Sequence, residues 1–253
     1  VLDADDWFNT ESIPEFLDII SGASADVVLT CHHTINISTG EIKNWRCFPD
    51  EPGREYTMEE VMGNWKNFDR SLTFHGITYR TEFYREHGVK LAENVFYEDH
   101  EYATYPCCVA HTILPLGLFI YEYRIGDVSQ SVSAENQLKR IDHTKMVIVK
   151  MLKNRVDITD QWALEYCDKK IHLLLLSFMV TSMLCDPDRK KGVARVDQLM
   201  GYIAKKDRHV VEMTMSHYKI LKLLNAAHVG LEGYNRMLNS KLYNKLRHNK
   251  SFD

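Results

Sequence analysis

Residues 1–7 read VLDADDW, so three carboxylates lie within four positions of one another at the beginning of the chain. Carboxylates this close repel one another unless a cation lies among them, and Asp3, Asp5 and Asp6 therefore indicate a hard divalent ion, Mn²⁺ or Mg²⁺. We interpret Val1 and Leu2 as the end of a buried strand, which would face the crevice where α/β sheets bind ligands. The alternative interpretation is an acidic loop that caps the next helix.

Composition narrows the class of protein. The chain has 253 residues, enough for one large domain or two small ones. Its 45% apolar and 26% charged residues are typical of an ordinary globular protein, and a net charge of −4 gives no sign of nucleic-acid binding. The six cysteines lack zinc-finger spacing and no secretory signal is visible, so we expect reduced thiols and a cytoplasmic location.

Helices and strands alternate after the acidic stretch. Ser12 with Glu15, and Thr57 with Glu60, are each spaced as a capping box at the start of a helix. The pattern of β-branched and apolar residues predicts strands over 26–37, 42–48, 74–79 and 115–124, and a short helix over 81–87. The fold class predicted from this order is α/β.

A second acidic site follows at residues 96–100, which read FYEDH. We expect Glu98 and Asp99 to begin a helical stretch that runs to about residue 112 and bends at Pro106. The alternative is a helix N-terminus that carries acids only because the helix dipole favours them there.

Two adjacent pairs, His32-His33 and Cys107-Cys108, could suggest a metal site. Neighbouring residues on a strand point to opposite faces, so we do not expect either pair to hold one ion.

The order of the segments resembles that of the family 2 glycosyltransferases with a GT-A fold. The resemblance covers residues 1–133 and rests on a strand leading into DADDW, a capped helix, ADVVLT, GITYRTEFYREHGVKLAENVFYEDHEY and PLGLFIYEYRIGDVSQSVS. It implies a metal-dependent inverting enzyme that moves a sugar from a nucleotide-sugar donor to a hydroxyl of a glycan or lipid-linked acceptor. The chain would then be a partial GT-A core over residues 1–133, followed by an α-helical region over 134–253.

The resemblance also implies roles for individual residues. Asp3 and Asp5 would bind the metal, and Asp3 and Asp6 would contact the diphosphate and ribose of the donor. Asp99 would be the catalytic base, with Glu98 beside it. Tyr121, Tyr123 and Arg124 match the Y-x-Y-R strand of the family, for which we expect a structural role.

The chain departs from the family pattern in two ways. The nucleobase-binding half that precedes DADDW is missing, so we expect the back part of a longer protein, weak donor binding and an apolar sheet edge that a second copy could cover. The Q-x-x-R-W motif of processive synthases is met only as residues 137–141, QLKRI. We therefore expect an enzyme that adds one sugar at a time.

The region after residue 133 reads as helices. Ser133 could cap a helix over 136–152, Thr159 or Asp160 could open the next, and the apolar run 171–185 is too short and too polar for a membrane span. The last stretch, from about 207 towards 249, is basic near its end, at Arg236, Lys241, Lys245, Arg247 and Lys250. We favour a solvated face there, and the alternative is contact with an anionic membrane surface.

Three other interpretations stay open. A DxD motif after an apolar strand also opens the haloacid-dehalogenase-like phosphatases, although Trp7 stands where Thr or Val is usual. An EF-hand is a weaker match, because the loop glycine and the closing glutamate are out of place. The third is a non-catalytic binding or interaction module derived from a glycosyltransferase.

Overall fold

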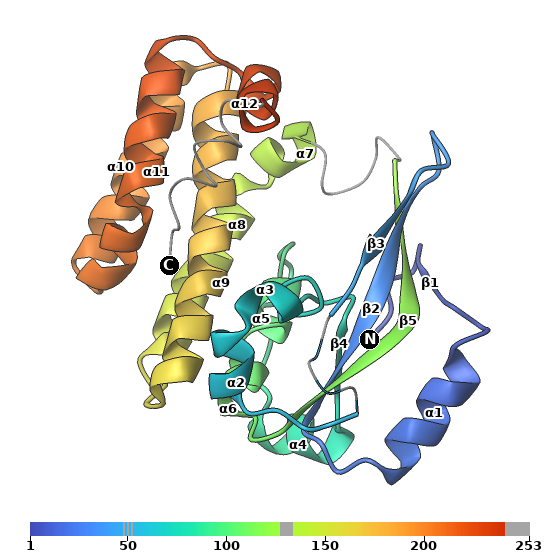
Figure 1. Cartoon of the computed structure of the whole chain (residues 1–253). Helices are drawn as coiled ribbons and strands as arrows, with labels where there is room; N and C mark the ends of the chain where they lie inside the picture. Colours follow the sequence, from blue (N-terminus) through green and yellow to red (C-terminus); the bar gives the residue numbers. More distant parts are fainter. Residues whose placement is uncertain (48, 50, 52, 127–133, 241–253) are drawn as a thin grey trace. The chain divides into compact units, whose positions relative to one another are not determined.

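A computed structural model describes residues 1–47, 49, 51, 53–126 and 134–240 (Figure 1). The chain divides into two compact units, which we describe separately. Unit 1 comprises Val1–Gln130 and Met146–Lys170, and unit 2 comprises Ser131–Lys145 and Ile171–Asp253. The boundary expected at residue 133 lies near the end of the first segment, but residues 146–170 belong to the same unit as the strands.

Unit 1 contains a mixed five-stranded sheet, so the predicted α/β class is confirmed. The strand order is β1-β5-β2-β3, and β4 pairs with β2 beside β3. The central strands β2 and β5 are parallel, and every other pairing is antiparallel. The bounds are β1 Trp7–Phe8, β2 Val27–Asn36, β3 Ile42–Trp45, β4 Ile77–Tyr79 and β5 Ile113–Ile125.

The first strand lies after the acidic stretch and not before it. Val1 and Leu2 are 76% and 40% exposed and belong to no strand, so the prediction for these two residues is wrong. The chain pairs with its antiparallel partner β5 at Trp7 and Phe8, which align with Glu122 and Tyr121, and the Asn9 amide then donates to the Ile120 carbonyl. The three carboxylates therefore precede an edge strand.

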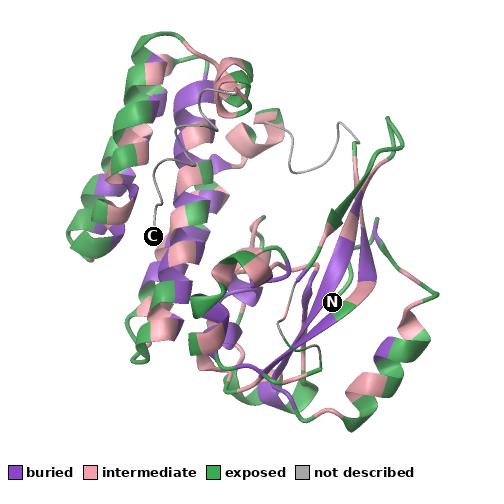
Figure 2. Ribbon diagram, in the orientation of Figure 1, coloured by how far each residue is buried: buried purple, intermediate pink, exposed green. Residues whose placement is uncertain are grey.

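Helices lie on both faces of this sheet. The first helix, α1 at Ile13–Gly22, buries Phe16 against a cluster of Val28, Leu116 and Ile120. Towards the other face lie short helices, as Figure 1 shows. They are α2 Met58–Gly63, α3 Trp65–Phe68, α5 Asp99–Tyr102 and α6 Tyr105–Val109, with α4 Thr81–His87 after β4. Figure 2 shows that the middle of β2 is buried whereas much of α1 is exposed.

One of the two predicted capping boxes is present. The Glu60 amide donates to Thr57 Oγ1 at 3.3 Å, and the Thr57 amide donates to the Glu60 carboxylate at 2.9 Å. Ser12 makes no such side-chain bond. The side chain of Asn9 instead accepts hydrogen bonds from the amides of Glu11 and Ser12, at 3.0 and 3.3 Å. A polar residue three positions earlier therefore stabilises the turn that leads into α1.

Three elements of unit 1 are shorter than predicted. The strand expected over 42–48 ends at Trp45, and the one expected over 74–79 begins at Ile77, because residues 73–76 form a turn in which the Thr73 carbonyl accepts from the amides of Gly76 and Ile77. The helix expected from Glu98 to residue 112 is two short helices, α5 and α6, which are separated at residues 103–104 and not bent at Pro106.

The remaining elements are helical. They are α7 Ala134–Lys139, α8 Ile141–Arg155, α9 Gln161–Val180, α10 Arg189–Ala204, α11 Arg208–Ala226 and α12 Leu231–Leu238. Asp160 caps α9 through the Ala163 amide at 2.8 Å, as predicted. The helix continues as a π-helical turn over Thr181–Cys185 and ends at Asp186, where the break was expected.

Unit 2 depends on a close helix contact. A Cβ atom on Gly192 of α10 would lie 2.0 Å from the carbonyl oxygen of Ser182, so only glycine allows α10 to approach the π-helical turn this closely. No helix in the described part of the chain is long and apolar enough to cross a membrane. The predicted cap Ser133 and the basic residues 241–250 lie outside the described residues.

Candidate functional site

The acidic stretch is tied to the central strand β5 by one of its own carboxylates. Asp6 is buried, and its two oxygens accept hydrogen bonds from the Tyr121 hydroxyl at 2.7 Å and from the Arg124 amide at 2.8 Å. The Tyr121 oxygen also accepts from the Asp3 amide at 3.2 Å. Both oxygens of Asp6 therefore position the loop, whereas the resemblance implied that Asp6 contacts the nucleotide.

Aromatic rings form a wall beside this loop. Tyr121 and Tyr123 lie two positions apart on β5 and so face the same side of the sheet. His75 stacks on Tyr123 with ring centroids 4.1 Å apart and meets the ring of Tyr121 at 5.0 Å. Burial raises the pKa of Tyr123 to about 12, and the charges of nearby carboxylates, Asp6 and Asp99 first among them, add to the shift. Tyr121 and the Arg124 amide of this strand thus hold Asp6, and Tyr123 packs on His75.

The second acidic segment is held by an internal anchor. Asp99 begins α5, and Glu98 precedes it without capping the helix by its side chain. Two residues later, Glu101 is 1% exposed and accepts from Lys150 Nζ and from the Ala92 amide, at 2.7 and 3.0 Å. These bonds fix the turn on which Asp99 lies.

The backbone before Asp99 is unusual. Tyr97 has a φ of +74° and Asn94 a φ of +58°, which lie in the left-handed region that residues other than glycine seldom adopt. Backbone strain of this kind is concentrated at functional sites, where surrounding contacts hold it in place. The strain lies directly before the predicted catalytic pair.

The two acidic segments come together in the fold. Partial desolvation raises the pKa of Asp3, and the negative charges of Asp6, Asp5, Asp99 and Glu98 raise it further. The field of Asp99 also acts on His75 and on Tyr123. All five predicted carboxylates, Asp6 included, therefore form one region of negative potential beside the aromatic wall.

This region fits a cation that is shared with a ligand. Asp3 and Asp5 are exposed, and a cation among the carboxylates would relieve the repulsion that raises the pKa of Asp3. Within the described residues, no three His, Cys, Asp or Glu side chains form a complete metal-binding group. Mg²⁺ is commonly bound by one or two carboxylates together with the phosphates of a substrate, so two exposed aspartates are enough for that mode.

The two adjacent pairs do not form metal sites. His32 is buried and packs against Trp45 and His75, whereas His33 stacks on Phe119, so the two rings separate as expected on a strand. Cys107 and Cys108 lie on helix α6, where a strand was assumed. The Cys107 thiol contacts the Tyr79 hydroxyl at 3.2 Å, and the Cys108 thiol points to the Ala163 carbonyl at 3.5 Å.

The incomplete Q-x-x-R-W motif is part of unit 2. Gln137 lies on α7, and its side-chain oxygen accepts a hydrogen bond from the Thr181 hydroxyl at 3.0 Å. This contact joins α7 to the π-helical turn after α9, which is a structural use of the residue.

Sequence reasoning missed His75. The residue lies in the turn before β4, and nothing in its neighbours along the chain marks it as functional. Its one local signal is the following Gly76, at which a Cβ atom would lie 2.3 Å from the Ser71 carbonyl oxygen. A glycine required by close backbone approach indicates a tightly defined turn.

Comparison with known proteins gives no family for this chain. No protein-family model matches the sequence, and no curated protein matches it. The function must therefore be inferred from the residues and their geometry.

Proposed function

We propose that this chain carries the metal and acceptor sites of a metal-dependent inverting glycosyltransferase with a GT-A fold. The enzyme would move one sugar from a nucleotide-sugar donor to a hydroxyl of a glycan or lipid-linked acceptor. The observation that supports this most is the convergence of the two acidic segments. The ring of Phe74 contacts Tyr121, which binds Asp6, and Tyr102 of the helix that begins at Asp99, at 6.2 and 5.6 Å between centroids, and the charges of Asp99 and Glu98 act on Asp3. Each segment alone is equally compatible with a helix N-terminus, but their meeting beside one aromatic wall is not explained by capping.

The two segments would supply different parts of the reaction. Asp99 would take the proton of the acceptor hydroxyl as that oxygen attacks the anomeric carbon from the face opposite the departing diphosphate. Asp3 and Asp5 would hold Mn²⁺ or Mg²⁺, which when bound neutralises charge on the departing diphosphate. Asp6 would keep this loop on β5 through its bonds to Tyr121 and Arg124.

The first experiment measures the cation directly. Binding of Mn²⁺ is followed by the loss of the paramagnetic resonance signal of the free ion, with and without uridine diphosphate. We expect the diphosphate to tighten Mn²⁺ binding, and Asp5→Ala to abolish the increase. Glu11→Ala, at another exposed acid near the same loop, is the control and should leave it unchanged.

The second experiment tests the base. Hydrolysis and transfer by the full-length protein are measured with a panel of uridine and guanosine diphosphate sugars in the presence of Mn²⁺. Asp99→Asn should lower turnover by about 10²–10⁴-fold, the usual contribution of a positioned base, while Glu98→Gln does much less. A reversal of these effects would assign the base to Glu98, and equal turnover in all three proteins would refute the mechanism.

A non-catalytic module derived from such an enzyme makes a different prediction. It would retain Mn²⁺-dependent binding of the diphosphate but show no turnover with any sugar nucleotide. Hydrolysis of p-nitrophenyl phosphate that depends on Asp3 would instead support the phosphatase interpretation.

A further inference from the structure

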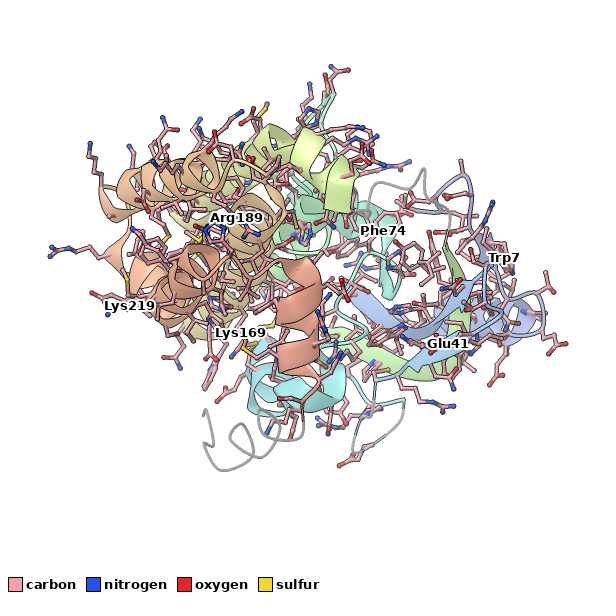
Figure 3. The ribbon with its side chains drawn as sticks, turned by 90° about the horizontal axis from the view of Figure 1, so that it is seen from above. Trp7, Glu41, Phe74, Lys169, Arg189 and Lys219 are labelled. Carbon is pink, nitrogen blue, oxygen red and sulfur yellow. The ribbon has the colours of Figure 1, made fainter. Side chains whose placement is uncertain are left out.

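His75 lies beside the carboxylates but has no role in the mechanism above. Its ring is packed on several sides, by Tyr123 at 4.1 Å, Tyr121 at 5.0 Å and His32 at 5.2 Å between centroids. Phe74, which is labelled beside the strands in Figure 3, meets it edge-on at 5.6 Å. These contacts fix the plane of the imidazole.

The backbone fixes its position as well. The Gly76 carbonyl accepts a hydrogen bond from the Thr30 amide at 2.8 Å, which ties the turn to the central strand β2. A Cβ atom on Gly76 would overlap the Ser71 carbonyl, so a residue with a side chain at this position would force the turn to change shape. His75 is therefore held rigidly against the sheet, as a residue that binds a ligand should be.

The imidazole keeps hydrogen-bonding capacity. Within the described part of the chain, no hydrogen bond of the His75 ring is found, and neither of its nitrogens is among the buried atoms without a partner, unlike Nδ1 of His32. Neither nitrogen of His75 is therefore completely buried. Burial lowers the pKa of His75 to about 4 even though the charge of Asp99 acts in the opposite direction, so the ring is neutral at pH 7.

A neutral imidazole offers one donor and one acceptor. This pair matches a hydroxyl, which also donates and accepts, whereas a phosphate only accepts and an ammonium group only donates. The surrounding carboxylates further disfavour an anionic ligand. Two exposed aromatic side chains add the apolar surface that ligand sites use. Phe8, 39% exposed, meets the ring of Tyr121 at 6.2 Å between centroids, and Phe96, 41% exposed, precedes the second acidic segment.

We propose that His75 binds a second hydroxyl of the acceptor, adjacent to the hydroxyl that Asp99 deprotonates. The acceptor is then an uncharged sugar that presents two neighbouring hydroxyls to the site. This inference rests on the proposed function, because it assumes that Asp99 is the base for a hydroxyl acceptor.

The test uses simple sugars and needs no donor. Methyl glycosides of glucose, galactose, mannose and N-acetylglucosamine are titrated into the chain while the ring nitrogens of His75 are followed by long-range ¹H–¹⁵N correlation. We expect at least one glycoside to shift the His75 ring resonances. His75→Phe keeps the stacked ring but removes both nitrogens. It should lower the affinity for that glycoside about three- to tenfold, which is the contribution of one hydrogen bond.

Two further variants control the result. His33→Phe changes a histidine that is also stacked on an aromatic ring, Phe119 at 4.2 Å, but that lies next to His32 on β2 and so points to the other face. It should leave the glycoside affinity unchanged. His75→Gln, which retains a donor and an acceptor, should bind more tightly than His75→Phe, and the resonance shift of the unaltered chain needs no variant at all.

The outcomes separate the two proposals. The inference is wrong if no glycoside moves the His75 resonances, if His75→Phe binds glycosides as tightly as the unaltered chain, or if ethanolamine or glycerol phosphate binds more tightly than every glycoside. Failure of the proposed function would look different, because nucleotide-sugars would not be turned over with Mn²⁺ although His75 still responded to glycosides.

Discussion

Removal of a single hydroxyl should loosen the acidic loop. Tyr121→Phe deletes the group that donates to Asp6 at 2.7 Å and accepts from the Asp3 amide at 3.2 Å. A hydrogen bond to a charged group contributes about 1.5–3 kcal/mol and an ordinary one about 0.5–1.5 kcal/mol. Tyr121 is 3% exposed, but Asp3 is at the surface, so the second bond contributes little. We expect a total loss of about 2–3 kcal/mol in the free energy of unfolding.

Urea denaturation of unit 1 measures this loss, and the same strand supplies the control. Tyr123 lies two positions further along β5, and no hydrogen bond of its hydroxyl is found within the described residues. Tyr123→Phe should therefore change stability by less than about 0.5 kcal/mol. In a double-mutant cycle, Tyr121→Phe and Asp6→Asn should be coupled by about 1 kcal/mol or more. Equal losses in the two tyrosine variants would refute this account of the loop.

Three further outcomes follow from other contacts. Burial raises the pKa of Asp26, but hydrogen bonds from the His111 amide and from Arg80 outweigh this effect, so the pKa is lowered in the folded protein. The ionised Asp26 therefore stabilises the fold fully above about pH 4, and this stabilisation is lost as the pH falls. Asp26→Asn should therefore destabilise at pH 7 by about 1–3 kcal/mol and far less at pH 2, in urea titrations at both pH values. Gly192→Ala should destabilise unit 2 by about 1–3 kcal/mol, whereas Gly201→Ala in the same helix, with nothing within 4 Å of the added Cβ, should stabilise it by about 0.5–1 kcal/mol. Asp3→Asn should raise the melting temperature in metal-free buffer at pH 7 but not at low pH. The reason is that a carboxylate whose pKa is raised by folding destabilises the folded state only where it is ionised, above that pKa. An unchanged melting temperature at pH 7 would contradict this prediction.

Local features of the fold were predictable where the partner lies within a few residues. The Thr57 and Glu60 box is complete within one helical turn, and both its bonds form as expected. Ser12 and Glu15 have the same spacing, but Asn9 accepts from the Ser12 amide, which the Glu15 side chain would use, and the box does not form. The strand assigned to Val1 and Leu2 fails for a related reason, because strand pairing depends on where β5 lies.

The residues of the candidate site also differ in how far the sequence predicts them. Asp3, Asp5 and Asp99 could be singled out because carboxylate clusters are visible in the sequence. Their convergence could not be predicted from spacing, since it depends on β5 and on the anchor of Glu101 to Lys150. His75 could not be singled out, because nothing near it in the sequence indicates that the fold stacks its ring on Tyr123.

The order in which the chain folds follows from the parallel pairing of β2 with β5. Val27 aligns with Ile113, and Asp6 reaches Tyr121 across 115 residues, so these contacts form only after long loops have closed. Contacts of such separation are slow to form, and the acidic loop docks only once β5 is in place. The mutual repulsion of the carboxylates therefore arises only when this long-range contact forms. A divalent cation added during refolding should then speed the docking of the loop, as stopped-flow refolding with and without Mn²⁺ would measure.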